Sequence, residues 1–131
     1  MKQKGFTLVE ILAVITIIGI LALLTIPTVD SIIRSSKEDA YEVQKEAILI
    51  SLKNWASSKT LTLPVVNGET LTTTIGELKT AGFLEVETKN PINELCFSNA
   101  TVLIVTRINS NYTYTFADED NISFTENCEV E

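Results

Sequence analysis

A charge-free segment near the amino terminus constrains the fold of this chain more than any other feature. Between Glu10 and Asp30 there is no charged residue, and residues 11–29 are apolar or small apart from three threonines. A bilayer core about 30 Å thick is crossed by about 20 helical residues, so this segment is long enough to span a membrane. A secretory signal peptide has a shorter apolar centre and a small-residue cleavage site. Residues 25–30, which read TIPTVD, match such a site poorly.

The charges on either side of this segment predict its orientation. Lys2 and Lys4 precede it, whereas the rest of the chain is acidic and brings the net charge to −7. Because lysine and arginine favour the cytoplasmic side of a membrane span, we expect the amino end in the cytoplasm and the remainder outside. Hydropathy alone fits equally well an uncleaved anchor that carries an extracytoplasmic domain.

Glu10 places a carboxylate at the cytoplasmic edge of this span. An acidic side chain costs about 2.5–3.5 kcal/mol at the centre of a membrane helix and less near the interface, so Glu10 is tolerated if it reaches headgroup water. A second interpretation gives it a partner. If the chain is cut after Gly5, Phe6 gains a positive α-amine, and Glu10 can pair with this amine or with that of a neighbouring chain. Because an unpaired buried charge is strongly destabilising, such pairing would fix the register of a helix bundle.

Residues 4–10 read KGFTLVE and lead directly into the apolar segment. Over residues 1 to about 30 the chain resembles the amino terminus of type IV prepilins and the related pseudopilins. The resemblance implies that a membrane aspartyl prepilin peptidase cuts between Gly5 and Phe6 and then N-methylates Phe6. It assigns Glu10 to pairing with the amino terminus of an adjacent subunit. It also assigns Pro27 to a kink in the long helix, and an interior proline does remove one backbone hydrogen bond.

The same resemblance implies an α+β pilin fold, in which one long amino-terminal helix, transmembrane in its first half, packs against a small antiparallel β-sheet. The implied function is that of a structural subunit in a type IV pilus used for adhesion, twitching motility or DNA uptake. The precursor would cross the cytoplasmic membrane once and then enter an extracellular filament. The implied partners are membrane lipid, further copies of the chain, minor pilins, an assembly ATPase and a membrane platform protein. Two other functions stay open: a pseudopilin of a type II secretion or competence system, and a membrane-anchored binding domain.

This interpretation divides the chain into four parts. Residues 1–5 form the leader, 6–29 the membrane and assembly half of the helix, 30–58 its amphipathic half, and 59–131 a globular head. In the amphipathic half the apolar residues recur at spacings near three and four, which predicts a helix lying on a sheet. One stripe contains Tyr41, Ile48, Leu52 and Trp55, and beside it fall Ala40, Val43, Ala47 and Ile50.

The head is predicted to contain one short helix and several strands. Thr74 and Glu77 have the spacing of a capping box for a helix over 75–81, with Gly82 just past its end. Segments rich in β-branched and aromatic residues then predict an antiparallel meander whose apolar face, including the rings of residues 112, 114 and 116, packs on the helix. The predicted strands are 95–98, 101–109, 112–117 and 122–125, with turns at 110–111 and 118–121.

The two cysteines of the chain are Cys96 and Cys128. Outside the cytoplasm disulfides persist, so a bridge between them is expected, and it would stabilise the head by about 3–4 kcal/mol through loop entropy. The alternative is two buried free thiols. In the resembling family, a carboxy-terminal disulfide loop often lies on the filament exterior.

The composition argues against several other functions. The chain contains no histidine and no cluster with metal-ligand spacing, and no catalytic or nucleotide-binding motif is present, so we expect neither an enzyme nor a metal or cofactor site. Phosphate binding requires clustered lysine and arginine residues. Since the chain is acidic and has no such cluster, direct nucleic-acid binding is not expected.

Overall fold

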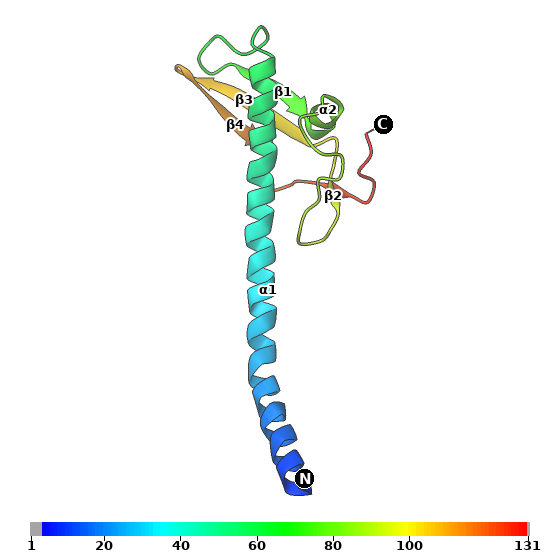
Figure 1. Cartoon of the computed structure of the whole chain (residues 1–131). Coiled ribbons are helices and arrows are strands. Elements are labelled where there is room, and N and C mark those ends of the chain that lie inside the picture. The colour runs from blue at the N-terminus through cyan, green and yellow to red at the C-terminus, as the bar shows by residue number, and fades with distance from the viewer. Residues whose placement is uncertain (1–3, 131) are drawn as a thin grey trace. The chain divides into compact units, whose positions relative to one another are not determined.

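The computed structural model describes residues 4–130, apart from the side chain of Pro27. Helix α1 spans Leu8–Ser58 and is followed by the shorter elements of the head (Figure 1). These are β1 (Thr70–Thr74), α2 (Ile75–Thr80), β2 (Cys96–Phe97), β3 (Val102–Ile108), β4 (Asn111–Phe116) and β5 (Phe124–Thr125). The predicted α+β class, with a long apolar amino-terminal helix and a small antiparallel sheet, is confirmed.

The chain divides into two compact units, with the boundary between Lys37 and Glu38. In the first unit, every side chain described from Lys4 onward is exposed. The threonine hydroxyls of the apolar segment are nevertheless satisfied. The Thr16 hydroxyl donates to the carbonyl of Leu12 at 2.7 Å, and Thr25 and Thr28 donate in the same way to carbonyls of the preceding turn. The threonine hydroxyls therefore add no unpaired donor, which suits a helix surrounded by apolar groups.

The second unit contains two antiparallel sheets rather than the single meander that the sequence predicts. The larger sheet has the order β1-β3-β4, and the smaller one pairs β2 with β5. The hairpin of β3 and β4 is as expected, but its turn is at Asn109 and Ser110, one residue earlier than predicted, because Ile108 pairs with Asn111. Asn109 has φ 56°, a left-handed conformation that asparagine tolerates in tight turns.

Strand β1 is absent from the sequence-based assignment. Its sequence, TLTTT, has one apolar residue, so the alternation that normally identifies a half-buried strand is missing. Its position is fixed by pairing with β3, in which Leu71 is opposite Val105 and Thr73 is opposite Leu103. The strand enters α2 directly, and Thr74 serves as both the last residue of the strand and the helix cap.

The cap of α2 follows the prediction. The Thr74 hydroxyl accepts from the Glu77 N–H at 3.2 Å, and the Glu77 carboxylate accepts from the Thr74 N–H at 3.1 Å. Gly82 follows the helix with φ +82°, which glycine adopts without steric cost. This reciprocal pairing satisfies two backbone donors that a helix start otherwise leaves free.

The core of the head forms where one stripe of α1 meets both sheets and α2. Of the predicted stripe, Ile48 and Leu52 are fully buried, and Tyr41 and Trp55 pack against the core. The neighbouring positions differ, because Val43 and Ile50 remain exposed, so the buried stripe is narrower than expected. Along β4 the rings at 112, 114 and 116 face the core, as predicted. The other buried core residues are Ala56, Ile75, Leu78, Phe97, Leu103, Val105 and Phe116.

Candidate processing and assembly site

The residues around the predicted cleavage point have no regular secondary structure. Lys4, Gly5, Phe6 and Thr7 precede the helix and are exposed. No atom outside the adjacent residues lies within 4 Å of the position that a Cβ on Gly5 would occupy. The peptide bond between Gly5 and Phe6 is thus open to an enzyme, and the structure itself places no steric limit on a side chain at position 5.

Helix α1 starts two residues later than the sequence predicts, because Thr7 and Glu10 form a capping box. The Thr7 N–H donates to Glu10 Oε2 at 2.8 Å, and the Glu10 N–H donates to Thr7 Oγ1 at 3.3 Å. The predictions from sequence overlooked the role of Thr7. The signal was present, since a threonine followed three residues later by glutamate before an apolar run is the signature of a capping box.

This contact gives Glu10 a partner within its own chain before any cleavage takes place. A carboxylate near a helix amino terminus is also favoured by the helix dipole. Glu10 further lines an open groove along the first turns of the helix, together with apolar side chains. Phe6, Ile11, Ala13, Val14 and Ile15 complete this groove. The Glu10 carboxylate is therefore presented beside apolar surface that the other described residues leave exposed.

The apolar surface beyond this groove is long and continuous. In the amino-terminal unit, the exposed large apolar residues of α1 extend from Leu8 to Ile33, and Leu23, at 74%, is among the most exposed. A contiguous exposed apolar surface of this size marks contact with a membrane or with other protein. By length and composition, α1 is able to cross a membrane.

Comparison with known families identifies this junction. Residues 1–26 match the model of the prokaryotic N-terminal methylation motif. Over these residues the chain is similar to prepilins. The matched region contains Gly5, Phe6, Thr7 and Glu10 and covers most of the apolar segment. No curated protein and no solved structure gives a significant match to the chain. The motif supports a pilin-like or pseudopilin precursor of structural rather than catalytic type, and the exposed apolar helix fits a membrane-anchored precursor.

Pro27 follows the matched region and lies within α1. Its side chain is outside the described part of the structure, and the kink assigned to it stays a prediction. The helix assignment itself continues without a break through this position.

The predicted disulfide between the two cysteines is present in the head. Cys96, on β2, and Cys128 form a disulfide with a Cα–Cα distance of 5.3 Å, and the alternative of free thiols is not observed. The bridge connects residues separated by 32 positions in the sequence. It ties the segment after β5 to the smaller sheet.

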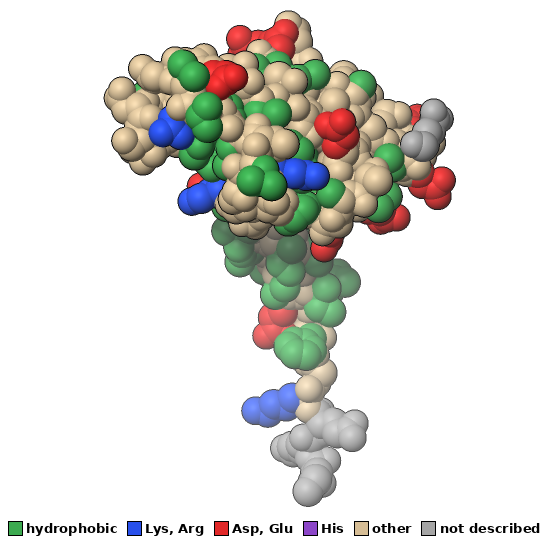
Figure 2. Space-filling model, turned by 90° about the horizontal axis from the view of Figure 1, so that it is seen from above, with side chains coloured by type: hydrophobic (Ala, Val, Ile, Leu, Met, Phe, Trp, Pro, Cys, Tyr) green, Lys and Arg blue, Asp and Glu red, His purple; other side chains and the backbone are tan. Residues whose placement is uncertain are grey.

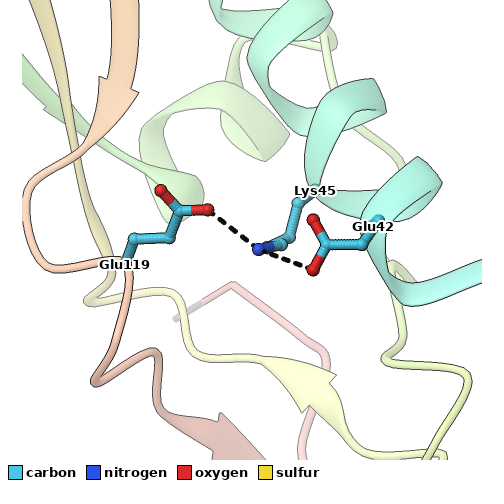
Figure 3. A network of polar contacts seen from close by, with 3 residues as sticks. All are labelled: Glu42, Lys45 and Glu119. Carbon is cyan, nitrogen blue, oxygen red and sulfur yellow. Dashed lines mark hydrogen bonds and ion pairs between the residues drawn. The ribbon is translucent and has the colours of Figure 1, made fainter. Parts of the chain in front are cut away.

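Lys45 supplies an ionic contact that the sequence did not indicate. Its side chain projects from α1 between two carboxylates, 2.9 Å from Glu119 and 3.0 Å from Glu42 (Figure 3). The hydrogen bond to Glu119 raises the pKa of Lys45 above its usual value, with a smaller contribution of the same sign from Glu42, and burial opposes both. Lys45 thus connects the helix to the loop between β4 and β5.

The charged side chains of the head are dispersed over the face seen in Figure 2, with apolar side chains between them. Among the described residues no group of histidine, cysteine, aspartate or glutamate is arranged to hold a metal ion. The site with the clearest chemical organisation in this chain is accordingly the amino-terminal junction.

Proposed function

We propose that the chain is the precursor of a pilin, the structural subunit of a type IV filament. The observation that carries the proposal is the amino-terminal junction, where an exposed Gly5–Phe6 bond precedes a capped helix that contains Glu10 and whose described side chains are all exposed as far as Lys37. In this proposal residues 1–5 are the leader, 6–29 the assembly half of the helix, 30–58 its amphipathic half and 59–131 the outward-facing head.

Leader removal would create a new positive charge at the start of the helix. A prepilin peptidase would hydrolyse the bond after Gly5 and transfer a methyl group to the amine of Phe6, which remains a cation after methylation. Phe6 immediately precedes Thr7, the capping residue, so its amine would lie beside the first free N–H groups of α1. A cation at this end is disfavoured by the helix dipole, and a carboxylate partner compensates for it.

Glu10 would supply that carboxylate in the assembled filament. Before assembly its charge is held by the Thr7 N–H at 2.8 Å. In a bundle of apolar helices, each Glu10 would instead meet the amine of a neighbouring copy. A wrong stagger would leave both charges unpaired in an apolar environment, so only one register would be stable. An assembly ATPase, a membrane platform protein and minor pilins would act on this subunit, which leaves membrane lipid for an extracellular filament.

The first test concerns cleavage. The chain is co-expressed with a prepilin peptidase, and its intact mass is measured after membrane extraction. We expect loss of residues 1–5 and gain of one methyl group on Phe6. Gly5→Leu should remain uncleaved. The chain itself has room for the leucine side chain, so the loss of cleavage would arise in the substrate-binding site of the peptidase. Gly19→Leu is the matched control, since Gly19 is equally open and should leave cleavage unchanged. An intact amino terminus in the wild type would contradict the proposal and would leave only the interpretation as a membrane-anchored binding domain.

The second test separates the two roles of Glu10. Glu10→Val removes both the charge and the cap, whereas Glu10→Gln removes the charge but keeps an acceptor suited to a capping box. Thr7→Val removes the reciprocal hydroxyl and leaves the charge. If pairing with an amine governs assembly, both Glu10 variants should insert in the membrane but fail to form fibres, and Thr7→Val should still assemble. Normal fibres from Glu10→Gln would refute the pairing role.

Electron microscopy of fibres sheared from the cell surface then distinguishes a surface pilus from a pseudopilin assembly. Long surface fibres that contain the processed chain are expected for a pilin. A processed chain that stays in the cell envelope without surface fibres would instead indicate a pseudopilin of a secretion or competence system.

A further inference from the structure

Lys79 is a buried lysine with no carboxylate partner among the described residues. It lies on α2 with 5% of its surface exposed, and its ammonium donates to Asn99 Oδ1 at 3.0 Å and to the carbonyl of Cys128 at 3.1 Å. Burial lowers the pKa of Lys79. Lys45, the other buried lysine of the head, differs because it contacts two carboxylates. A charge in this costly position, which the described residues partner only with neutral oxygens, requires an explanation.

The explanation lies in the segment that these bonds hold. The residues after β5 form no helix or strand, and within the described structure their backbone is attached to the head near Cys128. Lys79 binds the carbonyl of Cys128, and the Asn99 amide donates to the carbonyl of Glu129 at 2.7 Å. Two side chains therefore hold consecutive carbonyls at the cysteine that forms the disulfide with Cys96.

Asn99 is itself fixed against the start of α2. The Gly76 N–H donates to the Asn99 carbonyl at 3.0 Å, and a Cβ on Gly76 would come within 3.1 Å of the Asn99 Cβ. Only glycine allows this close approach without movement of its neighbour. Lys79, Asn99 and the backbone around Cys128 thus form one connected contact, which we call the tail clamp.

We infer that Lys79 is a positioning residue for formation of the Cys96–Cys128 disulfide. In the dithiol form the clamp would hold Cys128 beside β2, so that the second thiol is delivered to Cys96. Without a tether, the segment after β5 has to find this position against its conformational entropy. This role is independent of the proposed filament function, because it concerns the folding of the head alone.

Closure of the bridge has two chemical steps and needs an oxidant, here a small-molecule disulfide such as oxidised glutathione. The thiolate of Cys128, which is less buried than Cys96, attacks one sulfur of the oxidant, forms a mixed disulfide and releases one thiolate. The Cys96 thiolate then attacks Cys128 Sγ, and the second thiolate of the oxidant leaves. Two thiols are oxidised, one disulfide of the oxidant is reduced, and both protons pass to solvent. The clamp affects the second, intramolecular step.

The test follows these steps in the full-length chain in detergent. The reduced protein is mixed with oxidised glutathione, quenched with an alkylating agent at intervals, and analysed by intact mass. For Lys79→Met we expect unchanged formation of the mixed disulfide and ring closure slowed about tenfold, the value of one hydrogen bond to a charged group. The singly glutathionylated chain should therefore accumulate. Closure at the wild-type rate would overturn the inference.

Lys89→Met is the matched control. Lys89 pairs through its backbone with Cys96, but its side chain is exposed, so this variant removes a positive charge near the same disulfide and leaves the clamp intact. It should close at the wild-type rate, and equal slowing in both lysine variants would refute positioning by Lys79. If reduced Lys79→Met fails to give a folded circular dichroism spectrum, Asn99→Ala replaces it. That variant removes the acceptor for the Lys79 ammonium and the donor to Glu129, and unchanged closure there would equally overturn the clamp.

Discussion

The two helices in the described part of the chain begin with the same capping box, but in surroundings that differ completely. In the head, Glu77 accepts from the Thr74 N–H and also from the Thr73 hydroxyl, and the helix that it starts is packed into a core. In the amino-terminal unit, Glu10 accepts from the Thr7 N–H, and every described side chain of the helix that follows is exposed as far as Lys37. The first box completes a structure, whereas the second holds a carboxylate on a surface that still lacks its partner.

The difference shows where each unit obtains its stability. The head closes its own core with residues from α1, α2 and both sheets and adds a disulfide. The amino-terminal unit satisfies the hydroxyls of Thr16, Thr25 and Thr28 internally but leaves all its described apolar side chains exposed, so lipid or other helices have to cover them. Substitutions in the two units should therefore affect different measurements.

The largest effect expected from this comparison comes from two matched leucine truncations. Leu52 is fully buried in the head, and Leu23 is 74% exposed on the amino-terminal helix. Leu52→Ala should lower the free energy of unfolding of the head by about 3–5 kcal/mol, because it removes apolar contacts and leaves a cavity. Leu23→Ala should leave this value unchanged in detergent. Equal losses in both variants, measured by thermal or denaturant unfolding of the head, would show that the two units unfold together.

The contrast between the units also explains what could be predicted from sequence. The amino-terminal unit carries its information locally, in a charge-free run and a short motif around Gly5 and Glu10, and both can be read directly from the sequence. The pairing of β2 with β5 is not local, because β3 and β4 lie between them in the chain, and strand patterns alone favoured consecutive pairing. Strand β1 could not be predicted from its sequence, because four of its five residues are threonines and apolar and polar residues do not alternate along it.

The charged residues of the head show the same limit. Lys45 and Lys79 are lysines in amphipathic helices, and composition places such residues on the solvent side. Their burial depends on residues far along the chain, Glu119 for one and Asn99 with Cys128 for the other. Thr7 is a different case, because its capping-box signal is local and is contained in residues 7–10.

A smaller effect is expected from removing each cap in turn. Thr74→Ala should destabilise the head by about 1 kcal/mol, the usual value of an amino-terminal cap. Thr7→Ala should not change the unfolding of the head, because the helix start at Leu8 belongs to the other unit. The measurement is denaturant unfolding followed by the fluorescence of Trp55, which packs against the core of the head. A loss of similar size from Thr7→Ala would mean that the stability of the two helix starts is coupled.

The smallest effect should come from Lys45→Met, which keeps the apolar stem and removes the ammonium between Glu42 and Glu119. Both carboxylates are largely exposed, so water replaces the lost contacts and the expected loss is about 0.5–1 kcal/mol. The folded-state pKa of Lys45 is raised above 10.5, so its contribution is fully present below pH 10.5 and declines as the pH rises through the folded-state value. The stability difference between wild type and variant should therefore shrink in that alkaline range.

Lys53→Met tests whether this decline belongs to the ion pair. Lys53 lies on the same helix and is exposed, and no ion pair to it is present among the described residues. The free energy of unfolding of Lys53→Met should differ little from that of wild type at any pH. This variant controls for the general effect of removing one positive charge from an acidic protein. If Lys45→Met and Lys53→Met gave parallel profiles, the contact between α1 and the loop after β4 would add nothing to the head. The stability of the head would then rest on its apolar core and disulfide alone, which would sharpen its contrast with the amino-terminal unit, whose described residues have neither.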